Sequence, residues 1–290
     1  MKMPENNRCL LLIKEIFDSL SGKEKLIASF IIDFPNEVIR LSIEDFAAAC
    51  KTSVSSVIRF CKKIGCAGYK DLCRMLTADI MLSPKEISYD DTRPGDGVES
   101  IMRNVCMTNM KAIEKTMAIL DVKSLEAAVE ALCQAKRIDF YGVGASGIVA
   151  LDSQNKFLRI YKTGIASAEA HVQILSASSL TPGDVAVIIS HSGETYDILN
   201  VANIAQKTGA TLISITKYGK NSLASVANIN LFSSSTETMI RSGAMSSRIA
   251  QMTVIDILYT SVCSRLYDEV KPHLDKTRFV TSYMRPRITP

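Results

Sequence analysis

The chain has 290 residues, of which 47% are hydrophobic and 22% are charged, a composition typical of folded globular proteins and not of disordered ones. Its length favours two domains, and it contains no run of 18 apolar residues that could form a membrane-spanning helix. The net charge of +4 is too small for a basic surface that covers the whole molecule.

The N-terminal part of the chain is predicted to be helical, because apolar residues recur there at helical spacing. The apolar run at residues 10–13 is broken by Lys14 and no small-residue cleavage site follows, so we expect no signal peptide. Ser21 and Glu24 have the spacing of a capping box, which predicts where the second helix begins. Pro35 predicts the end of that helix.

The segment SIEDFAAACKTSVSSVIRFCKKI, residues 42–64, is typical of a helix-turn-helix. Ser42 and Ser53 are suitable N-caps for two short helices, with a tight turn at Lys51 and Thr52 between them. The residues expected to face inward from the second helix are Val54, Val57, Ile58 and Cys61. In DNA-binding versions the second helix enters the major groove, where hydroxyl and guanidinium groups reach base edges and lysines bind phosphates. The predicted DNA contacts are therefore the outward residues Ser53, Ser55, Ser56, Arg59, Lys62 and Lys63.

Basic residues are concentrated around this second helix. Between residues 51 and 74 the chain has six basic residues and one acidic residue, and the rest of the chain is nearly neutral. A cationic face at one place indicates contact with a polyanion there. The alternative interpretation is an ordinary pair of helices in a bundle. Tyr69 is either a contact to the DNA backbone or an aromatic residue of the core.

A change of composition separates the helical part from the rest. Residues 83–97 are rich in proline, glycine and aspartate and are predicted to form a linker. The amphipathic stretch that follows predicts a helix that packs on the second domain or on a partner subunit. The predicted divisions are a helix-turn-helix domain at 1–80, a linker and helix at 81–123, an α/β domain at 124–267 and a C-terminal tail at 268–290.

The pattern changes again near residue 124. Strand-like runs at 138–143, 185–190, 211–216 and 229–234 alternate with helical segments. This alternation predicts a three-layer α/β domain, with a parallel sheet covered by helices on both faces. Ligands of such sheets bind at the carboxyl ends of the strands.

A glycine-rich loop follows the first of these strands. In YGVGASG, residues 141–147, Gly142, Gly144 and Gly147 match the GxGxxG pattern, and Glu169 follows about 20 residues later. Taken alone, this pattern indicates a dinucleotide site and an NAD-dependent oxidoreductase.

A second loop, SHSGET at residues 190–195, follows the next strand and favours a different ligand. It supplies hydroxyl groups and a glycine at a helix N-terminus, where free backbone N–H groups favour a phosphate. The two loops together predict a pocket for one compact phosphate instead of a dinucleotide, although Ser-rich loops are also ordinary capped turns. The predicted ligand contacts in the loops are Gly144, Ala145, Ser146, Ser190, His191, Ser192, Gly193 and Thr195. We expect no catalytic residue and no cofactor.

The eight cysteines include no CxxC pair and no spacing typical of a disulfide framework. Most have apolar neighbours, so we expect buried free thiols in a reducing cytoplasm. None of the three histidines stands near a cysteine pair, so we expect no metal site.

Together the two loops resemble the SIS domain, the phosphosugar-binding module of sugar isomerases. The whole chain resembles the RpiR/MurR family of transcriptional regulators, through residues 41–72, 141–147, 190–195 and 241–258. The resemblance implies a homodimer or homotetramer on an operator, whose DNA affinity changes when a sugar phosphate binds the serines and threonine of the loops. It also implies that segment 241–248 approaches the ligand, with Glu237, Arg241, Ser242 and His171 as further candidate contacts.

A DNA-binding regulator that senses a phosphorylated sugar is therefore the preferred interpretation. The alternative is a sugar-phosphate isomerase or ether lyase on the same fold, which needs a general base. Its available groups are Glu194, Glu237 and His171. The sequence leaves open which sugar binds, which operator is recognised, and whether the protein activates or represses.

Overall fold

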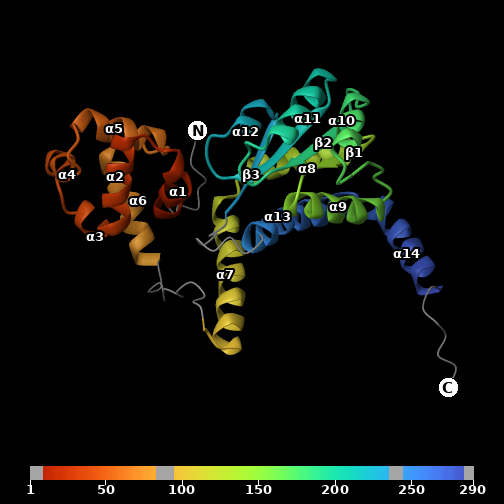
Figure 1. Ribbon diagram of the computed structural model, residues 1–290, viewed down its shortest axis with the longest axis horizontal. Coiled ribbons are helices and arrows are strands. Elements are labelled where there is room, and N and C mark those ends of the chain that lie inside the picture. Colours follow the sequence, from red (N-terminus) through yellow and green to blue (C-terminus); the bar gives the residue numbers. More distant parts are fainter. Residues whose placement is uncertain (1–8, 83–94, 235–243, 284–290) are drawn as a thin grey trace. The chain divides into compact units, whose positions relative to one another are not determined.

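The computed structural model describes residues 9–82, 95–234 and 244–283 (Figure 1). Its contacts group into two compact units, and the main boundary between them lies between Leu120 and Asp121. Among the described residues, no helix has both the length and the apolar character that a membrane span requires.

The first unit is helical, as the sequence predicted. Its elements are α1 (Cys9–Ile16), the short 3-10 turn η1 (Phe17–Ser19), α2 (Gly22–Asp33), α3 (Pro35–Val38), α4 (Ile43–Ala49), α5 (Val54–Lys63), α6 (Tyr69–Leu82) and α7 (Val98–Ile119). The capping box at Ser21 and Glu24 is present at the start of α2. Phe46 and Phe60 are fully buried and lie in one apolar cluster with side chains from α1 to α6.

Helix α5 begins and ends where its local sequence requires. The Ser53 hydroxyl accepts a hydrogen bond from the Ser56 N–H at 3.3 Å, and Gly65 follows the helix with φ +88°. Ile58 was expected to face inward, and this prediction is wrong, because Ile58 is 37% exposed and Phe60 is buried instead. Helical spacing puts Phe60 on the same face as Val57.

The second unit is the predicted α/β domain. Its elements are α8 (Val122–Gln134), β1 (Ile138–Tyr141), α9 (Ala145–Leu158), α10 (Ala170–Ser178), β2 (Val185–Ile189), α11 (Tyr196–Lys207), β3 (Thr211–Lys217), α12 (Ser222–Val226), β4 (Ile229–Ser233), α13 (Met245–Arg265) and α14 (Tyr267–Tyr283). Helix α14 occupies most of the segment that was expected as a tail. The strands are parallel in the order β1-β2-β3-β4, which confirms the predicted sheet.

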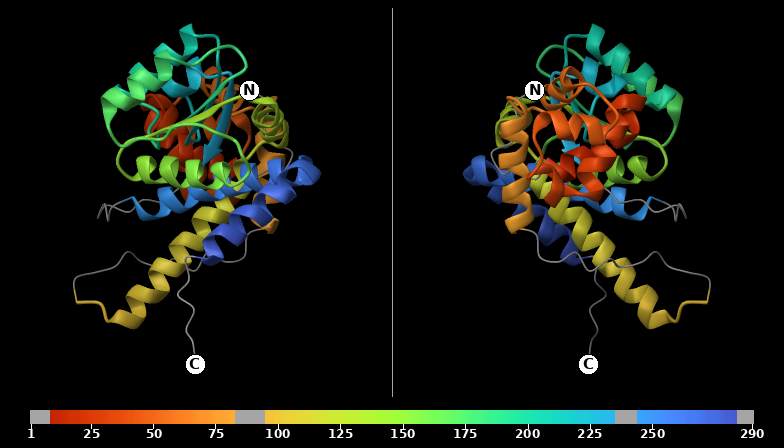
Figure 2. Two further views of the ribbon diagram at one scale, coloured as in Figure 1. Left: turned by 90° about the vertical axis from the view of Figure 1, so that its right-hand side faces the viewer. Right: turned by 90° about the vertical axis from the view of Figure 1, so that its left-hand side faces the viewer.

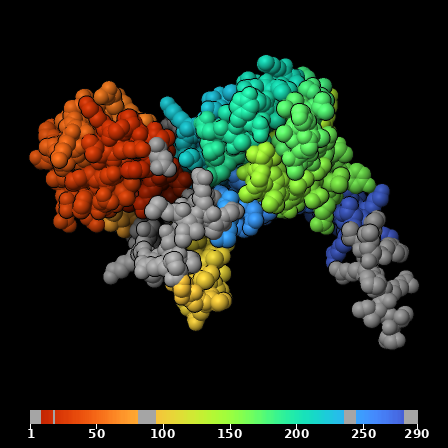
Figure 3. Space-filling model, viewed as in Figure 1, coloured from red at the N-terminus to blue at the C-terminus, as the bar shows by residue number. Residues whose placement is uncertain are grey.

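Helices cover the sheet on both faces (Figures 1 and 2). Helices α8, α9 and α13 pack on one face, and α10, α11 and α12 pack on the other. Helices α10 and α11 pack side by side, and both are visible at the molecular surface (Figure 3). A short bridge between Phe140 and Ala166 adds a further parallel partner on the free side of β1, which the sequence analysis missed.

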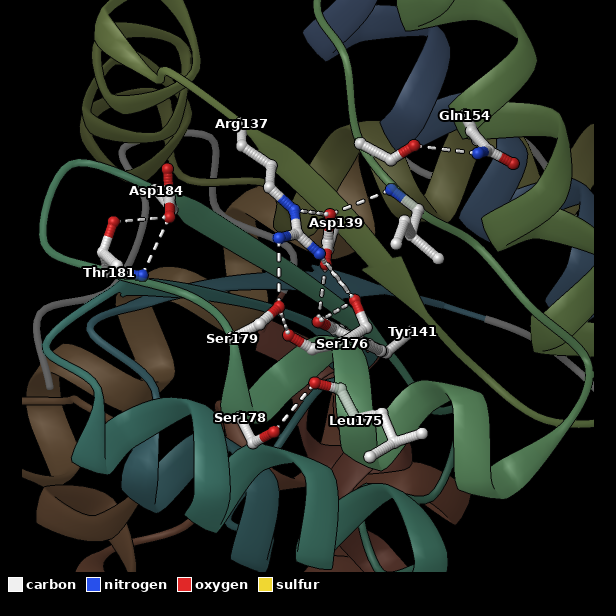
Figure 4. Close-up of polar contacts among 12 residues, drawn as sticks. Arg137, Asp139, Tyr141, Gln154, Leu175, Ser176, Ser178, Ser179, Thr181 and Asp184 are labelled. Atoms are coloured by element: carbon white, nitrogen blue, oxygen red, sulfur yellow. Dashed lines mark hydrogen bonds and ion pairs between the residues drawn. The ribbon is translucent and has the colours of Figure 1, made fainter.

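A polar network around the buried Asp139 joins β1 to α10 (Figure 4). Asp139 is fully buried, and the Arg137 guanidinium donates to both of its carboxylate oxygens, at 2.9 and 2.7 Å. The same carboxylate accepts from the Tyr141 hydroxyl at 3.0 Å, from the Ser176 hydroxyl, and from the Ile165 N–H at 2.9 Å. Burial, together with the charge of Asp139, raises the pKa of the Tyr141 phenol. The Asp139 carboxylate therefore holds together β1, α10 and the segment at Ile165.

Candidate functional site

The exposed side of α5 carries the residues that the sequence predicted as DNA contacts. Five of them are exposed and Ser56 is half-buried. The Ser53 hydroxyl lies 2.9 Å from the hydroxyls of Ser55 and Ser56, and Arg59 donates to the Ser56 hydroxyl at 3.4 Å. Polar groups of the first two turns thus form one connected, solvent-facing surface.

Lys63 differs from the other cations of α5, because it is held by an acid of α2. Its ammonium lies 2.6 Å from a carboxylate oxygen of Glu24, which also accepts from the Ser21 N–H at 2.8 Å. Burial acts to raise the pKa of Glu24, but the hydrogen bonds from Lys63 and Ser21 outweigh it and lower that pKa. The ion pair therefore anchors the end of α5 to the start of α2.

A surface hollow of about 550 Å³ lies beside this ion pair. It is lined by Ser21, Gly22, Lys23, Glu24, Ile27, Ser56 and Arg59. The hollow therefore lies between the start of α2 and the exposed side of α5.

Tyr69 is half-buried and packs against the core of the helical unit. Its hydroxyl donates to the carbonyl oxygens of Val38 at 2.8 Å and Leu41 at 3.2 Å, and its ring stacks on Phe46. Of the two interpretations left open by the sequence, these contacts favour the core aromatic.

The first glycine-rich loop makes a close turn from β1 into α9. A Cβ atom on Gly142 would lie 2.6 Å from the carbonyl oxygen of Ser146, and one on Gly147 would lie 3.1 Å from the carbonyl oxygen of Gly142. Gly144 caps α9 with φ +57°, a backbone conformation that favours glycine. The glycines are therefore needed for the close approach of strand and helix, and Ala145 and Ser146 begin α9.

Ser146 is buried beneath this turn. Its hydroxyl donates to the Oε1 atom of Gln251 in α13 at 3.2 Å. Gln251 lies in the stretch 241–258 that carries the family resemblance, but the sequence analysis did not single it out. A polar residue inside a long helix gives no local signal of the loop it will contact.

The second loop folds back on itself between β2 and α11. The buried Ser190 hydroxyl accepts from the Gly193 N–H at 3.2 Å and lies 3.3 Å from the Thr195 hydroxyl, and Ser192 accepts from the Glu194 N–H at 3.1 Å. The carbonyl oxygen of the half-buried His191 accepts from the Lys217 N–H at 2.8 Å, which ties the loop to β3.

Gly193 packs against the start of α12. It has φ +68°, and a Cβ atom there would lie only 2.1 Å from Oδ1 of Asn221. Its carbonyl oxygen also accepts from the Leu223 N–H at 3.0 Å. The backbone of the SHSGET loop is therefore fixed by contacts that leave no room for a side chain at this position.

The two loops leave the sheet at the same edge. Strands β1 and β2 are adjacent and parallel, and Tyr141 pairs with Ile188 in their register. Both strands therefore end side by side, and the hydroxyls of Ser146, Ser190 and Thr195 belong to neighbouring strand-to-helix connections. Helix N-termini and hydroxyls together suit an anionic group.

Two acids that the sequence marked as candidates serve as helix caps. Glu169 accepts from the N–H groups of His171 at 3.0 Å and Val172 at 2.8 Å, and these bonds lower its pKa. Glu194 accepts from the hydroxyl of Ser222 at 2.6 Å and from its N–H at 2.8 Å, which lowers the pKa of Glu194 as well. Both carboxylates therefore hold helix N-termini, Glu169 that of α10 and Glu194 that of α12.

Three further candidates, Glu237, Arg241 and Ser242, lie outside the described residues. His171 is exposed in the first turn of α10. Across residues 9–82, 95–234 and 244–283, no three acidic, histidine or cysteine side chains are grouped as metal ligands would be.

Comparisons with known proteins agree with this arrangement. A family model described as a helix-turn-helix domain of the rpiR family matches residues 7–82, and the SIS domain model matches residues 131–261. An HTH-type transcriptional regulator of Caldanaerobacter subterraneus is 42% identical over 94% of this chain and 96% of its own. The regulator HexR of Pseudomonas aeruginosa is 32% identical over 92% of this chain and 93% of its own.

A solved structure is similar over the same length. The Vibrio vulnificus NanR protein, complexed with ManNAc-6P, is 26% identical with a TM-score of 0.61, covering 97% of this chain and 100% of the other. The similarity therefore includes both units of the chain.

Proposed function

The chain belongs to the RpiR family of transcriptional regulators, and we therefore propose that a phosphorylated sugar bound by its SIS domain controls how tightly α5 binds operator DNA. The observation that carries the proposal is the pair of hydroxyl-bearing loops at the adjacent ends of β1 and β2. Such loops offer donors to a phosphate without a resident cation.

The exposed face of α5 supports the DNA-binding half of the proposal. Arg59 and the serines of the first turn would read bases, and Lys62 would neutralise a phosphate. A homodimer or homotetramer would place two such helices on half-sites related by symmetry.

The effector is proposed to be an amino sugar phosphate or a related phosphorylated sugar. The similar NanR protein was solved with ManNAc-6P, so N-acetylmannosamine 6-phosphate is the first compound to test. The phosphate would lie among Ser146, Ser190, Ser192 and Thr195, and the groups beside these loops would contact the sugar.

Regulation is proposed in preference to catalysis. An isomerase needs a carboxylate or histidine free to move a proton at one carbon of the substrate. Glu194 accepts from the hydroxyl and N–H of Ser222, and Glu169 accepts from two backbone N–H groups of α10, so both carboxylates are engaged in capping hydrogen bonds. These hydrogen bonds favour the ionised form and lower both pKa values, which makes each carboxylate a weaker proton acceptor.

The proposal predicts an effector-dependent change of DNA affinity. Fluorescence anisotropy would follow binding to DNA fragments from the region flanking the gene, with and without N-acetylmannosamine 6-phosphate and a panel of other sugar phosphates. A coupling of about 1–3 kcal/mol would change the affinity about 5- to 150-fold. Arg59→Ala should weaken DNA binding and leave the sugar phosphate affinity unchanged. The proposal fails if no fragment binds at low salt, or if bound sugar phosphates leave the DNA affinity unaltered.

Salt dependence should separate the two lysines at the end of α5. Lys62→Ala is expected to reduce the slope of log affinity against log salt by about one, the effect of losing one phosphate contact. Lys63→Ala should reduce it less, because Glu24 already neutralises that ammonium. Lys25→Ala is the control, since its ammonium lies over the Phe17 ring. Equal slopes for the two α5 variants would contradict this assignment.

A further inference from the structure

A buried amide lies directly behind the first phosphate loop. Gln251 is 1% exposed, and its Oε1 atom accepts the hydrogen bond from the Ser146 hydroxyl at 3.2 Å. The Nε2 atom of the same amide is buried and has no hydrogen-bond partner among the described residues. A buried N–H without a partner is rare, because its desolvation is not compensated.

A second buried amide, Gln173, also has one atom without a hydrogen-bond partner among the described residues, its Oε1, but it is held differently. Gln173 is also 1% exposed, but its Nε2 donates to the carbonyl oxygens of Gly142 at 2.9 Å and Ser167 at 2.7 Å. Carbonyl oxygens only accept, so the orientation of the Gln173 amide is fixed. Gln251 is held by a single hydroxyl, which can donate or accept, so its amide can turn over without losing that bond.

A bound phosphate would reverse the hydrogen bond between these two side chains. A phosphate dianion only accepts hydrogen bonds, and the Ser146 hydroxyl has one proton to give. When that proton points to the phosphate, Oε1 of Gln251 loses its donor. Rotation of the amide brings Nε2 to the lone pair of the hydroxyl instead. The result is a chain of donors from Gln251 through Ser146 to the phosphate, in which each bond strengthens the next.

We propose that Gln251 is a positioning residue for the effector phosphate, which accepts from Ser146 in the empty site and donates to Ser146 in the occupied one. The inference rests on the proposed function, since it assumes that Ser146 binds the phosphate. It extends the site to α13, a helix that also packs on α8, α9 and β4.

A double-mutant cycle tests the inference. The variants are Ser146→Ala, Gln251→Met and both together in the full chain, and the probe is inorganic phosphate at pH 8, measured by calorimetric titration. Gln251→Met keeps the side-chain length and removes the buried amide, so the fold should persist. It should weaken phosphate binding about fivefold, the effect of one neutral hydrogen bond. In the Ser146→Ala background the same substitution should have no effect.

A charged variant provides a second readout. Gln251→Glu presents an acceptor that holds the Ser146 proton and repels the anion, so binding of sulfate should be lost at pH 8. At pH 5 a protonated carboxyl can again donate to Ser146, and sulfate affinity should partly return. Sulfate keeps its charge across this range, so the recovery reports the carboxyl and not the probe.

The outcomes separate this inference from the function on which it rests. Equal losses of phosphate affinity from Gln251→Met in both backgrounds, or no recovery of the Gln251→Glu variant at pH 5, would overturn the relay. The proposed phosphate site would still stand in that case if Ser146→Ala alone weakened phosphate binding. If the unaltered protein binds neither phosphate nor sulfate, and no sugar phosphate binds it, the proposed function fails and the relay fails with it.

Discussion

Replacing Asp139 with alanine is expected to lower the free energy of unfolding of the α/β unit by about 3–5 kcal/mol, the range for breaking a buried ion pair. The change leaves the Arg137 guanidinium without its anion, and that side chain is only 27% exposed. It also removes the acceptor of the Tyr141 hydroxyl and of the Ile165 N–H. Chemical denaturation followed by circular dichroism would measure the loss.

Asp152→Ala is the matched control for this prediction. Asp152 also forms an ion pair, with Lys156 at 2.5 Å, but its side chain is 35% exposed and Lys156 keeps a second anion, Asp256 at 2.6 Å. Exposed pairs contribute about 0–1 kcal/mol, so the control should change the free energy of unfolding little. If both variants lose the same stability, the buried network does not hold β1 and α10 together as described.

Gly193→Ala is expected to abolish the response to the effector. A Cβ atom at this position would lie 2.1 Å from the Asn221 side chain that caps α12, and φ is +68°, so we expect the SHSGET loop to move away from α12. Its displacement separates Ser190 and Thr195 from their present positions, and we expect sugar phosphate affinity to fall at least about tenfold, equivalent to 1.4 kcal/mol. DNA binding should persist but no longer change with the effector. Anisotropy with DNA and calorimetry with N-acetylmannosamine 6-phosphate would measure the two properties.

Gly183→Ala separates the steric effect from backbone strain. Gly183 also has a positive φ, +96°, but the nearest atom to a Cβ there is a Lys136 carbon at 3.7 Å. It precedes β2 and lies away from the carboxyl end of that strand. This variant should lose about 1–2 kcal/mol of stability from the left-handed backbone and keep its effector affinity. A loss of effector affinity in both variants would contradict the role of the Asn221 contact.

Local sequence signals predicted most of the fold. Strand β2 and the centre of β3 are short runs of buried, mostly β-branched and apolar residues, and α5 has its serine cap and its terminal glycine next to it in the chain. Each signal lies within a few residues of the feature that it specifies. This is why the order of elements, the parallel sheet and the glycine-dependent turn after β1 could be predicted.

Contacts between residues far apart in the chain could not be predicted. Nothing near Gln251 indicates Ser146, and nothing near Asp139 indicates Ser176 or Ile165. Glu169 shows the opposite error, because its spacing from the glycine loop fits a dinucleotide pattern although the carboxylate caps α10. The carboxylate instead accepts from the N–H groups of the two residues that begin the helix after it, His171 and Val172.

The parallel strand order also has a consequence for how the chain folds. In the register of the sheet Ile138 pairs with Val185, so the first pair of strands can form only by closing the long connection that contains α9 and α10. The connection between α4 and α5 is much shorter than the one between β1 and β2, so their contacts form more easily. This segment is also synthesised first. The helix-turn-helix half of the chain can therefore fold on the ribosome before the SIS half, so the part that binds DNA is complete before the part that we propose to bind the effector.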